Sequence, residues 1–176
     1  MKFCIQASAP RTTGIFNAED ETLDEAIETT FFLNSEMALI NWSGVFIPLS
    51  YKYSISTILA DVLLMLQTIL ENNHETLELT WPSSDFNSRW VMSWKDDYLK
   101  IDAKWESVIG NTEEILNSLD SIEIGKTEFL NEWKMLLEVI LNGLDTCGYD
   151  ESTIKEISIM QSVYSNIETY GILYKD

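Results

Sequence analysis

Side chains able to carry out covalent or acid–base catalysis are few in this chain of 176 residues. It has one histidine, His74, and two cysteines, Cys4 and Cys147. Catalytic dyads and triads need a nucleophile beside a positioned general base, which is most often histidine. His74 follows Asn73 where a predicted helix gives way to a strand, a position typical of a surface residue. Because nothing in the spacing of Cys147 and His74 favours a catalytic pair, we predict that the protein is not an enzyme.

The sequence also lacks the usual binding motifs for metals and phosphate groups. A structural zinc site takes four Cys or His ligands at close spacing, and the chain has three such residues in total. The segment 145–156 has the length of a calcium loop with acids at both ends, but Cys147, Tyr149 and Asp150 stand where oxygen ligands and a glycine are needed. No glycine-rich phosphate loop occurs. We therefore predict no metal and no cofactor.

The charge of the chain is strongly unbalanced. Eleven Lys and Arg against 29 Asp and Glu give a formal net charge of −18, with a sequence pI of about 4.2. Nucleic acids and anionic membranes are bound through Lys and Arg, so this charge argues against both as partners. It favours a basic protein, because opposed potentials speed the encounter of two proteins. An acidic surface that only keeps the protein soluble is the alternative interpretation.

Acidic residues are concentrated in two stretches. Residues 101–150 hold eleven acids and three lysines, a net charge of −8, and residues 19–28 hold six acids without a Lys or Arg. The first stretch predicts a partner-binding site of five acids: Glu113, Glu114, Asp120, Glu123 and Glu128. A solvated helix face produces the same pattern, so both interpretations stay open at this point.

The clearest structural signal lies between residues 75 and 107, where three segments alternate apolar and polar residues with the period of a strand. The apolar faces carry three tryptophans: Trp90, Trp94 and Trp105. Asp96-Asp97 is predicted as the turn between the second and third segments, and residues 82–87 as the loop between the first two. This pattern indicates an antiparallel meander with one wet face and with these tryptophans in the core.

Helical periodicity is strongest in two segments, residues 58–70 and residues 129–144. Thr127 is predicted to cap the start of the second helix, and Gly148 to follow its end. A third helix is expected over roughly residues 151–168.

Further strands are expected over residues 2–8 and in a hairpin about Asn34-Ser35, whose arms are residues 29–33 and 37–42. No repeat, low-complexity tract or linker divides the chain. The predicted fold is therefore one α+β domain over residues 1–176. It has an antiparallel sheet of five to six strands, including the three-strand meander, covered by two or three helices.

Location follows from the same features. Two cysteines far apart in sequence do not make a disulfide framework, so free thiols in a reducing compartment are expected. The apolar part of residues 1–9 is shorter than a signal sequence needs. The longest apolar stretch, residues 58–70, is interrupted by Asp61 and falls short of the ~20 residues that span a bilayer. We expect a soluble, cytoplasmic protein.

One resemblance adds to this interpretation. The orders Trp90-x-Met92-x-Trp94, Tyr98-Leu99-x-Ile101-x-Ala103-x-Trp105 and Phe129-Leu130-x-Glu132-Trp133-x-x-Leu136-Leu137 resemble those of small bacterial immunity proteins, which protect against polymorphic or contact-delivered toxins. The resemblance covers about a third of the chain and carries over no functional residue. It implies a stoichiometric inhibitor that is made in the cytoplasm and binds one toxin domain. Together with the acidic charge, this predicts that the inhibitor occludes the basic active-site surface of a toxin, such as a nuclease.

Two other functions stay open on the sequence alone. A nucleic-acid mimic of the anti-restriction type has the same acidity, but it is expected to bind several unrelated DNA enzymes. A small ligand-binding module or an unrecognised enzyme is expected to have a deep pocket lined by convergent polar groups. The sequence does not indicate the oligomeric state.

Overall fold

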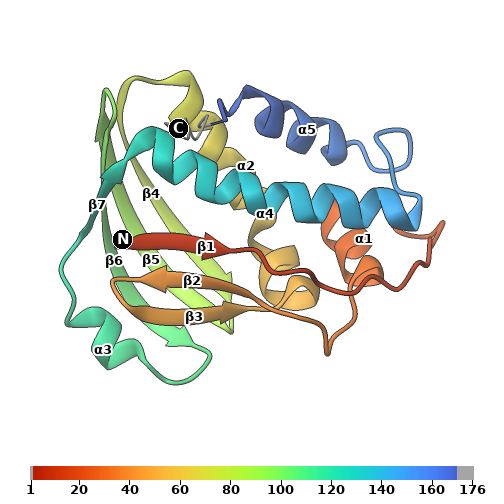
Figure 1. Cartoon of the computed structure of the whole chain (residues 1–176), viewed down its shortest axis with the longest axis horizontal. Coiled ribbons are helices and arrows are strands. Elements are labelled where there is room, and N and C mark those ends of the chain that lie inside the picture. The colour runs from red at the N-terminus through yellow and green to blue at the C-terminus, as the bar shows by residue number, and fades with distance from the viewer. Residues whose placement is uncertain (1, 170–176) are drawn as a thin grey trace, which may run out of the picture.

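Two antiparallel sheets form the β part of the fold (Figure 1). The computed structural model describes residues 2–169. The three-stranded sheet has the order β1-β2-β3: β1 Phe3–Gln6, β2 Ala38–Trp42 and β3 Val45–Leu49. The four-stranded sheet has the order β4-β5-β6-β7: β4 His74–Ser83, β5 Phe86–Lys95, β6 Tyr98–Val108 and β7 Ile122–Gly125.

The predicted meander is confirmed as β4-β5-β6. Its strands alternate buried and exposed residues along their length, and Trp90, Trp94 and Trp105 lie in the core. Asp96 occupies the second turn with φ of +53°. The first turn is tighter than predicted, because β4 and β5 pair up to Ser83 and Phe86.

The α+β class is confirmed, but the prediction of one sheet with five to six strands is wrong. Within residues 2–169, seven strands form two sheets, which face each other through Trp42 of β2. The ring of Trp42 lies 5.1 Å from that of Trp90 and 5.1 Å from that of Trp105, measured between ring centroids. Because this indole fills the space between the sheets, β1-β2-β3 stacks against the meander instead of extending it edge to edge.

The hairpin predicted about Asn34-Ser35 is also wrong. Residues 29 and 30 of its first arm belong to α1, Leu23–Thr30, and of the rest only Phe31 makes an isolated bridge, with Thr12. Its second arm is confirmed as β2. Glu25 fixes the start of α1 by accepting a hydrogen bond from the backbone N–H of Thr22 at 3.3 Å. The helix that starts at this cap includes residues 29 and 30 despite their β propensity. The true hairpin joins β2 to β3 at Ser43-Gly44, where both residues have positive φ.

The described part of the chain has five α-helices where two or three were predicted: α1, α2 Ser56–Glu71, α3 Glu113–Asn117, α4 Lys126–Cys147 and α5 Glu156–Asn166. A π-helical turn, η1, over Tyr51–Ile55 runs directly into α2. The helix α2 packs on β4, and α4 packs on β1 and β7. Figure 1 shows α4 crossing the whole molecule, with α5 beside it.

The predicted cap at Thr127 is wrong by two residues. Gly125, the last residue of β7, is the N-cap, and α4 begins at Lys126. The hydroxyl and the backbone N–H of Thr127 both donate to the carboxylate of Asp97, at 2.8 and 3.0 Å. Since Asp97 lies in the β5–β6 turn, it ties the start of α4 to the sheet. The prediction for Gly148 is confirmed, with φ of +90° after the last helical residue.

Residues 51–71, which combine η1 and α2, are long and apolar enough to cross a membrane by length and composition, with a mean hydropathy of 1.6. More than half of the apolar stretch, 56%, is buried inside the fold. The core helix of a soluble protein gives the same pattern, and cytoplasmic location stays a prediction.

Candidate protein-binding surface

The five acids predicted to bind a partner lie along one edge of the four-stranded sheet: Glu113 and Glu114 in α3, Asp120 before β7, Glu123 in β7 and Glu128 in α4. Figure 1 shows α3 at one end of this edge and the start of α4 at the other. Glu123 pairs with Lys100 of β6, whereas Glu113 contacts Val108. Eight positions along a strand span roughly 26 Å. The five acids therefore form an extended strip, which we call the acidic strip.

Members of the acidic strip differ in their availability to a partner. Glu114, Asp120, Glu123 and Glu128 are exposed. Glu113 is half-buried, and its carboxylate accepts a hydrogen bond from the backbone N–H of Val108 at 2.7 Å. This bond holds the pKa of Glu113 below its ordinary value. Glu113 thus anchors α3 to the end of β6, and Glu123 forms a side-chain hydrogen bond with Tyr98 and lies beside Lys100. Glu114, Asp120 and Glu128 are the members of the strip that are most open to a partner.

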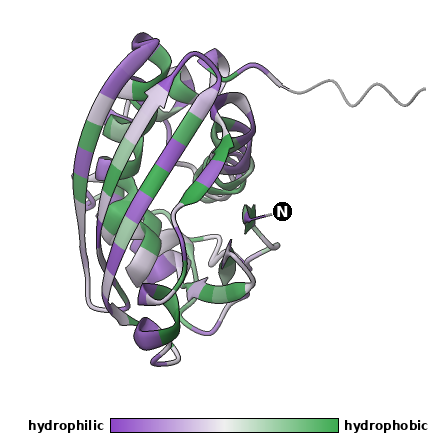
Figure 2. Cartoon of the chain, turned by 90° about the vertical axis from the view of Figure 1, so that its left-hand side faces the viewer, coloured by the Kyte–Doolittle hydropathy of each residue, from purple (hydrophilic) through white to green (hydrophobic). Residues whose placement is uncertain are grey.

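The outer face of the meander carries charges of both signs that pair with each other. The guanidinium of Arg89 holds both carboxylate oxygens of Glu78 at 2.7 Å, and Lys100 lies 2.9 Å from Asp102. Each cation lowers the pKa of its partner carboxyl through this hydrogen bond. Figure 2 shows the alternation of hydrophilic and hydrophobic residues along these strands. This face is consequently close to electrically neutral.

Three lysines are bound to the carboxyl ends of helices. The ammonium of Lys52 donates to the carbonyl of Glu28 in the last turn of α1. Lys126 donates to the carbonyl of Asn72 at the end of α2, at 3.2 Å. Lys134 donates to the carbonyl of Ile167 at the end of α5. Helix carboxyl ends carry unpaired carbonyls and partial negative charge, so these cations stabilise the fold from within.

The fold therefore uses most of its few cations internally. Within residues 2–169, six of the ten Lys and Arg side chains have a helix end or a carboxylate as partner: Arg11, Lys52, Arg89, Lys100, Lys126 and Lys134. In that same range, three carboxylates lie within 4 Å of a Lys or Arg nitrogen: those of Glu36, Glu78 and Asp102. The negative charge that remains is presented at the surface.

The two side chains considered for catalysis lie at opposite ends of α4. His74 begins β4, and its ring is 3.1 Å from the carbonyl of Trp94, near the start of α4. Cys147 is the last residue of that helix and is buried. A helix of 22 residues is about 33 Å long. Among residues 2–169 the structure has no group of three or more side chains that could hold a metal ion.

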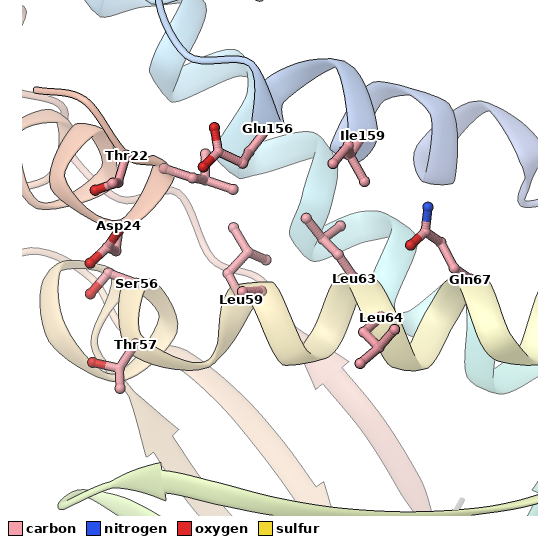
Figure 3. Close-up of a pocket in the computed structure, with 12 residues that line it drawn as sticks. Thr22, Asp24, Ser56, Thr57, Leu59, Leu63, Leu64, Gln67, Glu156 and Ile159 are labelled. Atoms are coloured by element: carbon pink, nitrogen blue, oxygen red, sulfur yellow. The ribbon is translucent and has the colours of Figure 1, made fainter.

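A feature that was not predicted from the sequence is a pocket of about 480 Å³ between α1, α2 and α5 (Figure 3). We call it the helical groove and define it by six of its lining residues: Asp24, Leu59, Leu63, Leu64, Glu156 and Ile159. Buried Leu59 and Leu63 point into it, and Leu64 and Ile159 are 55% and 42% exposed. Its lining includes two carboxylates and no Lys or Arg. The groove is thus an apolar trough with acidic groups at its rim.

The sequence contained a weak signal for this groove. Leu64 and Ile159 are apolar, yet each lies outside the run of apolar residues that defines the buried face of its helix. Single exposed apolar residues are common, so neither position stands out alone. Only the packing of α5 against α2 brings them to one groove.

Comparison with known protein families, with curated proteins and with solved structures finds no match for this chain.

Proposed function

We propose that the protein is a stoichiometric inhibitor of a basic protein, and that it serves as an immunity protein against a cognate bacterial toxin. The observation that carries this proposal is the division of charge in the fold. Five of the ten cations in residues 2–169 are bound to helix ends or to sheet carboxylates, while exposed acids such as Glu114, Asp120 and Glu128 stay available at the surface. A surface of this kind is complementary to a protein rich in Lys and Arg.

The proposed mechanism is occlusion. Many toxin domains act on phosphate-containing substrates, which Lys and Arg hold in the active site. The exposed acids of the acidic strip would pair with those cations and block access of the substrate. Opposed potentials would also accelerate the encounter, so that a small amount of inhibitor acts quickly. This mechanism needs no catalytic group in the inhibitor.

The direct test is protection of cells. The toxin candidate encoded next to this gene is expressed in a bacterial host with and without the chain, and growth is followed. The proposal predicts restored growth together with a one-to-one complex of the purified proteins. Growth that is not restored despite soluble expression of both proteins would overturn the proposal.

A panel of unrelated nucleases and restriction enzymes serves as the matched comparison. An immunity protein inhibits its cognate toxin and leaves the panel active. Inhibition of several unrelated DNA enzymes at similar concentrations would contradict the immunity function and indicate a nucleic-acid mimic instead.

A further inference from the structure

We infer that the helical groove is the site where the basic partner is anchored, by a helical segment that carries a bulky apolar side chain flanked by Lys or Arg. The inference rests on the proposed function and adds to it. It assigns the lasting contact to α1, α2 and α5, away from the acidic strip, and it specifies the chemistry of the partner segment.

The shape of the groove supports a protein segment as its occupant. Leu59 and Leu63 form a buried apolar floor, and Ala60 beside them leaves room above α2. Figure 3 shows Ile159 of α5 facing α2 across this space. Leu64 at the rim is half exposed, so the groove is open along one side. Small-molecule sites enclose most of their ligand, whereas an open apolar trough between helices suits an amphipathic helix.

The charge around the groove decides which segment fits. Figure 3 shows Asp24 of α1 together with Thr22, Ser56 and Thr57 at one end of the groove. Glu156 of α5 reaches the same space. Since no Lys or Arg lines the groove, an acidic segment would be repelled and a basic one attracted.

The second acidic stretch of the sequence, residues 19–28, adds negative charge near the groove. Six acids and no Lys or Arg occur over residues 19–28, which lead into and form most of α1. Two of them have roles within the fold. Asp20 accepts a hydrogen bond from the hydroxyl of Tyr149, and Glu25 accepts one from the backbone N–H of Glu21 at 2.9 Å. Asp24 is exposed and faces the groove. The acidic run and the apolar trough therefore meet at one end of the groove.

The first experiment uses a labelled peptide of about 14 residues, with leucines at helical spacing and lysines elsewhere. The same peptide with glutamate in place of lysine is the control. Binding is measured by fluorescence anisotropy near physiological salt. We expect saturable one-to-one binding of the lysine peptide and no binding of the glutamate peptide. Shifts in amide NMR signals should fall on α1, α2 and α5; shifts confined to the outer face of the meander would overturn the inference.

Leu64→Glu separates the groove from general attraction between opposite charges. This change adds a negative charge, so attraction to the whole acidic surface would tighten peptide binding. Binding in the groove would instead weaken, by about tenfold or more, because a carboxylate replaces the apolar rim. Met135→Glu is the matched control, since Met135 on α4 is also 55% exposed and does not line the groove. Binding to L64E as tight as binding to M135E would contradict the inference.

The acidic rim is tested with the double variant Asp24→Asn, Glu156→Gln. The control is Glu75→Gln, Glu106→Gln, which removes the same charge from exposed positions on the meander. We expect the rim variant to weaken peptide binding severalfold more than the control. Both acids also lie in the first turns of their helices, where they stabilise them, so thermal melts must show that the variant is folded. Equal effects of the two double variants would show that the rim acids do not recognise the peptide.

The cognate toxin distinguishes failure of this inference from failure of the proposed function. If wild-type protein does not bind or neutralise the toxin, the proposed function fails. If wild-type binds and L64E dissociates at the wild-type rate, only the groove inference fails. The expected result is a dissociation rate raised about tenfold or more in L64E and unchanged in M135E.

Discussion

The carboxylate of Glu132 on α4 accepts a hydrogen bond from the backbone N–H of Ile5 on β1, at 2.6 Å. β1 is an outer strand of the three-stranded sheet, and outer strands present unpaired N–H groups that other chains can bind. Phe129 of α4 stacks on Phe3 of the same strand, with ring centroids 5.2 Å apart. The helix α4 therefore covers this edge and binds one of its donors.

Burial of Glu132 gives a testable pH dependence. Desolvation raises the pKa of Glu132 above its ordinary value of 4.5, and it outweighs the opposite effect of the Ile5 hydrogen bond. A carboxyl whose pKa is higher in the folded state binds its proton more readily there. Its contribution to stability therefore falls as pH rises from the ordinary value through the raised one.

Glu132→Gln keeps an acceptor for Ile5 and removes the buried charge. We expect it to be at least as stable as wild type near neutral pH, and to lose part of the decrease in stability with rising pH. Glu132→Ala leaves the N–H of Ile5 without its acceptor and should cost about 1–3 kcal/mol. Urea melts at several pH values check both variants. Equal destabilisation of E132Q and E132A at neutral pH would show that the charge itself is required.

Gly143 on α4 allows α1 to approach that helix closely. A Cβ at this position would lie 2.5 Å from Cζ of Phe31, a ring that is 1% exposed. Gly143→Ala should therefore destabilise the protein by about 1–3 kcal/mol, although alanine is the better helix former by about 1 kcal/mol. Asn142→Ala, at the neighbouring exposed position, is the control and should change stability little. A more stable G143A protein would contradict the close packing.

The contact between the two sheets depends on Trp42. Its ring is 2% exposed and contacts Trp90 and Trp105. Trp42→Ala should lower the free energy of unfolding by about 3–5 kcal/mol, and so should Trp133→Ala, which removes a buried ring of α4. Near-UV circular dichroism of the folded protein should also weaken in W42A, because it removes one ring from the cluster. Val91→Ala on the exposed face of β5 is the control for both. A loss below about 1 kcal/mol in W42A would mean that the sheets hold together without it.

The acids of the strip are expected to act on association. Glu114→Lys with Asp120→Lys reverses two exposed charges of the acidic strip. This double variant should slow association with the cognate toxin more than it speeds dissociation. It should remain folded, with a slightly lower melting temperature because Glu114 lies in the first turn of α3. Glu75→Lys with Glu106→Lys changes the net charge equally at exposed positions of the meander and should affect association less. Full protection of cells by E114K/D120K would dispose of the strip as the steering surface.

Local patterns made part of this fold predictable. The alternation around Trp90, Trp94 and Trp105 predicted the meander, because a strand with one wet face repeats every two residues. Gly148 was predicted to end α4 because glycine readily adopts the positive φ found there. Features held by contacts distant in sequence were not predictable. Trp42 lies between the two sheets because it packs against Trp90 and Trp105, which are about 50 and 60 residues away in the chain.

The candidate site was also predictable only where local patterns reveal it. The acids of the strip were visible as a composition bias, but their spread along the edge required the register of β6 and β7. Thr127 was predicted as a helix cap, but its hydroxyl donates to the carboxylate of Asp97 instead. Asp97 lies thirty residues earlier, so the local sequence around Thr127 does not reveal this contact. The helical groove depends on three helices meeting, and Leu64 and Ile159 are ordinary surface residues until α5 packs against α2.

The most direct test of the central claim is the rate at which the purified chain associates with its cognate toxin domain, measured by stopped flow from about 50 mM to about 500 mM salt. We expect a one-to-one complex whose association rate falls steeply with salt, while the dissociation rate changes little. An association rate independent of salt would contradict the claim that acids on this surface meet a basic partner.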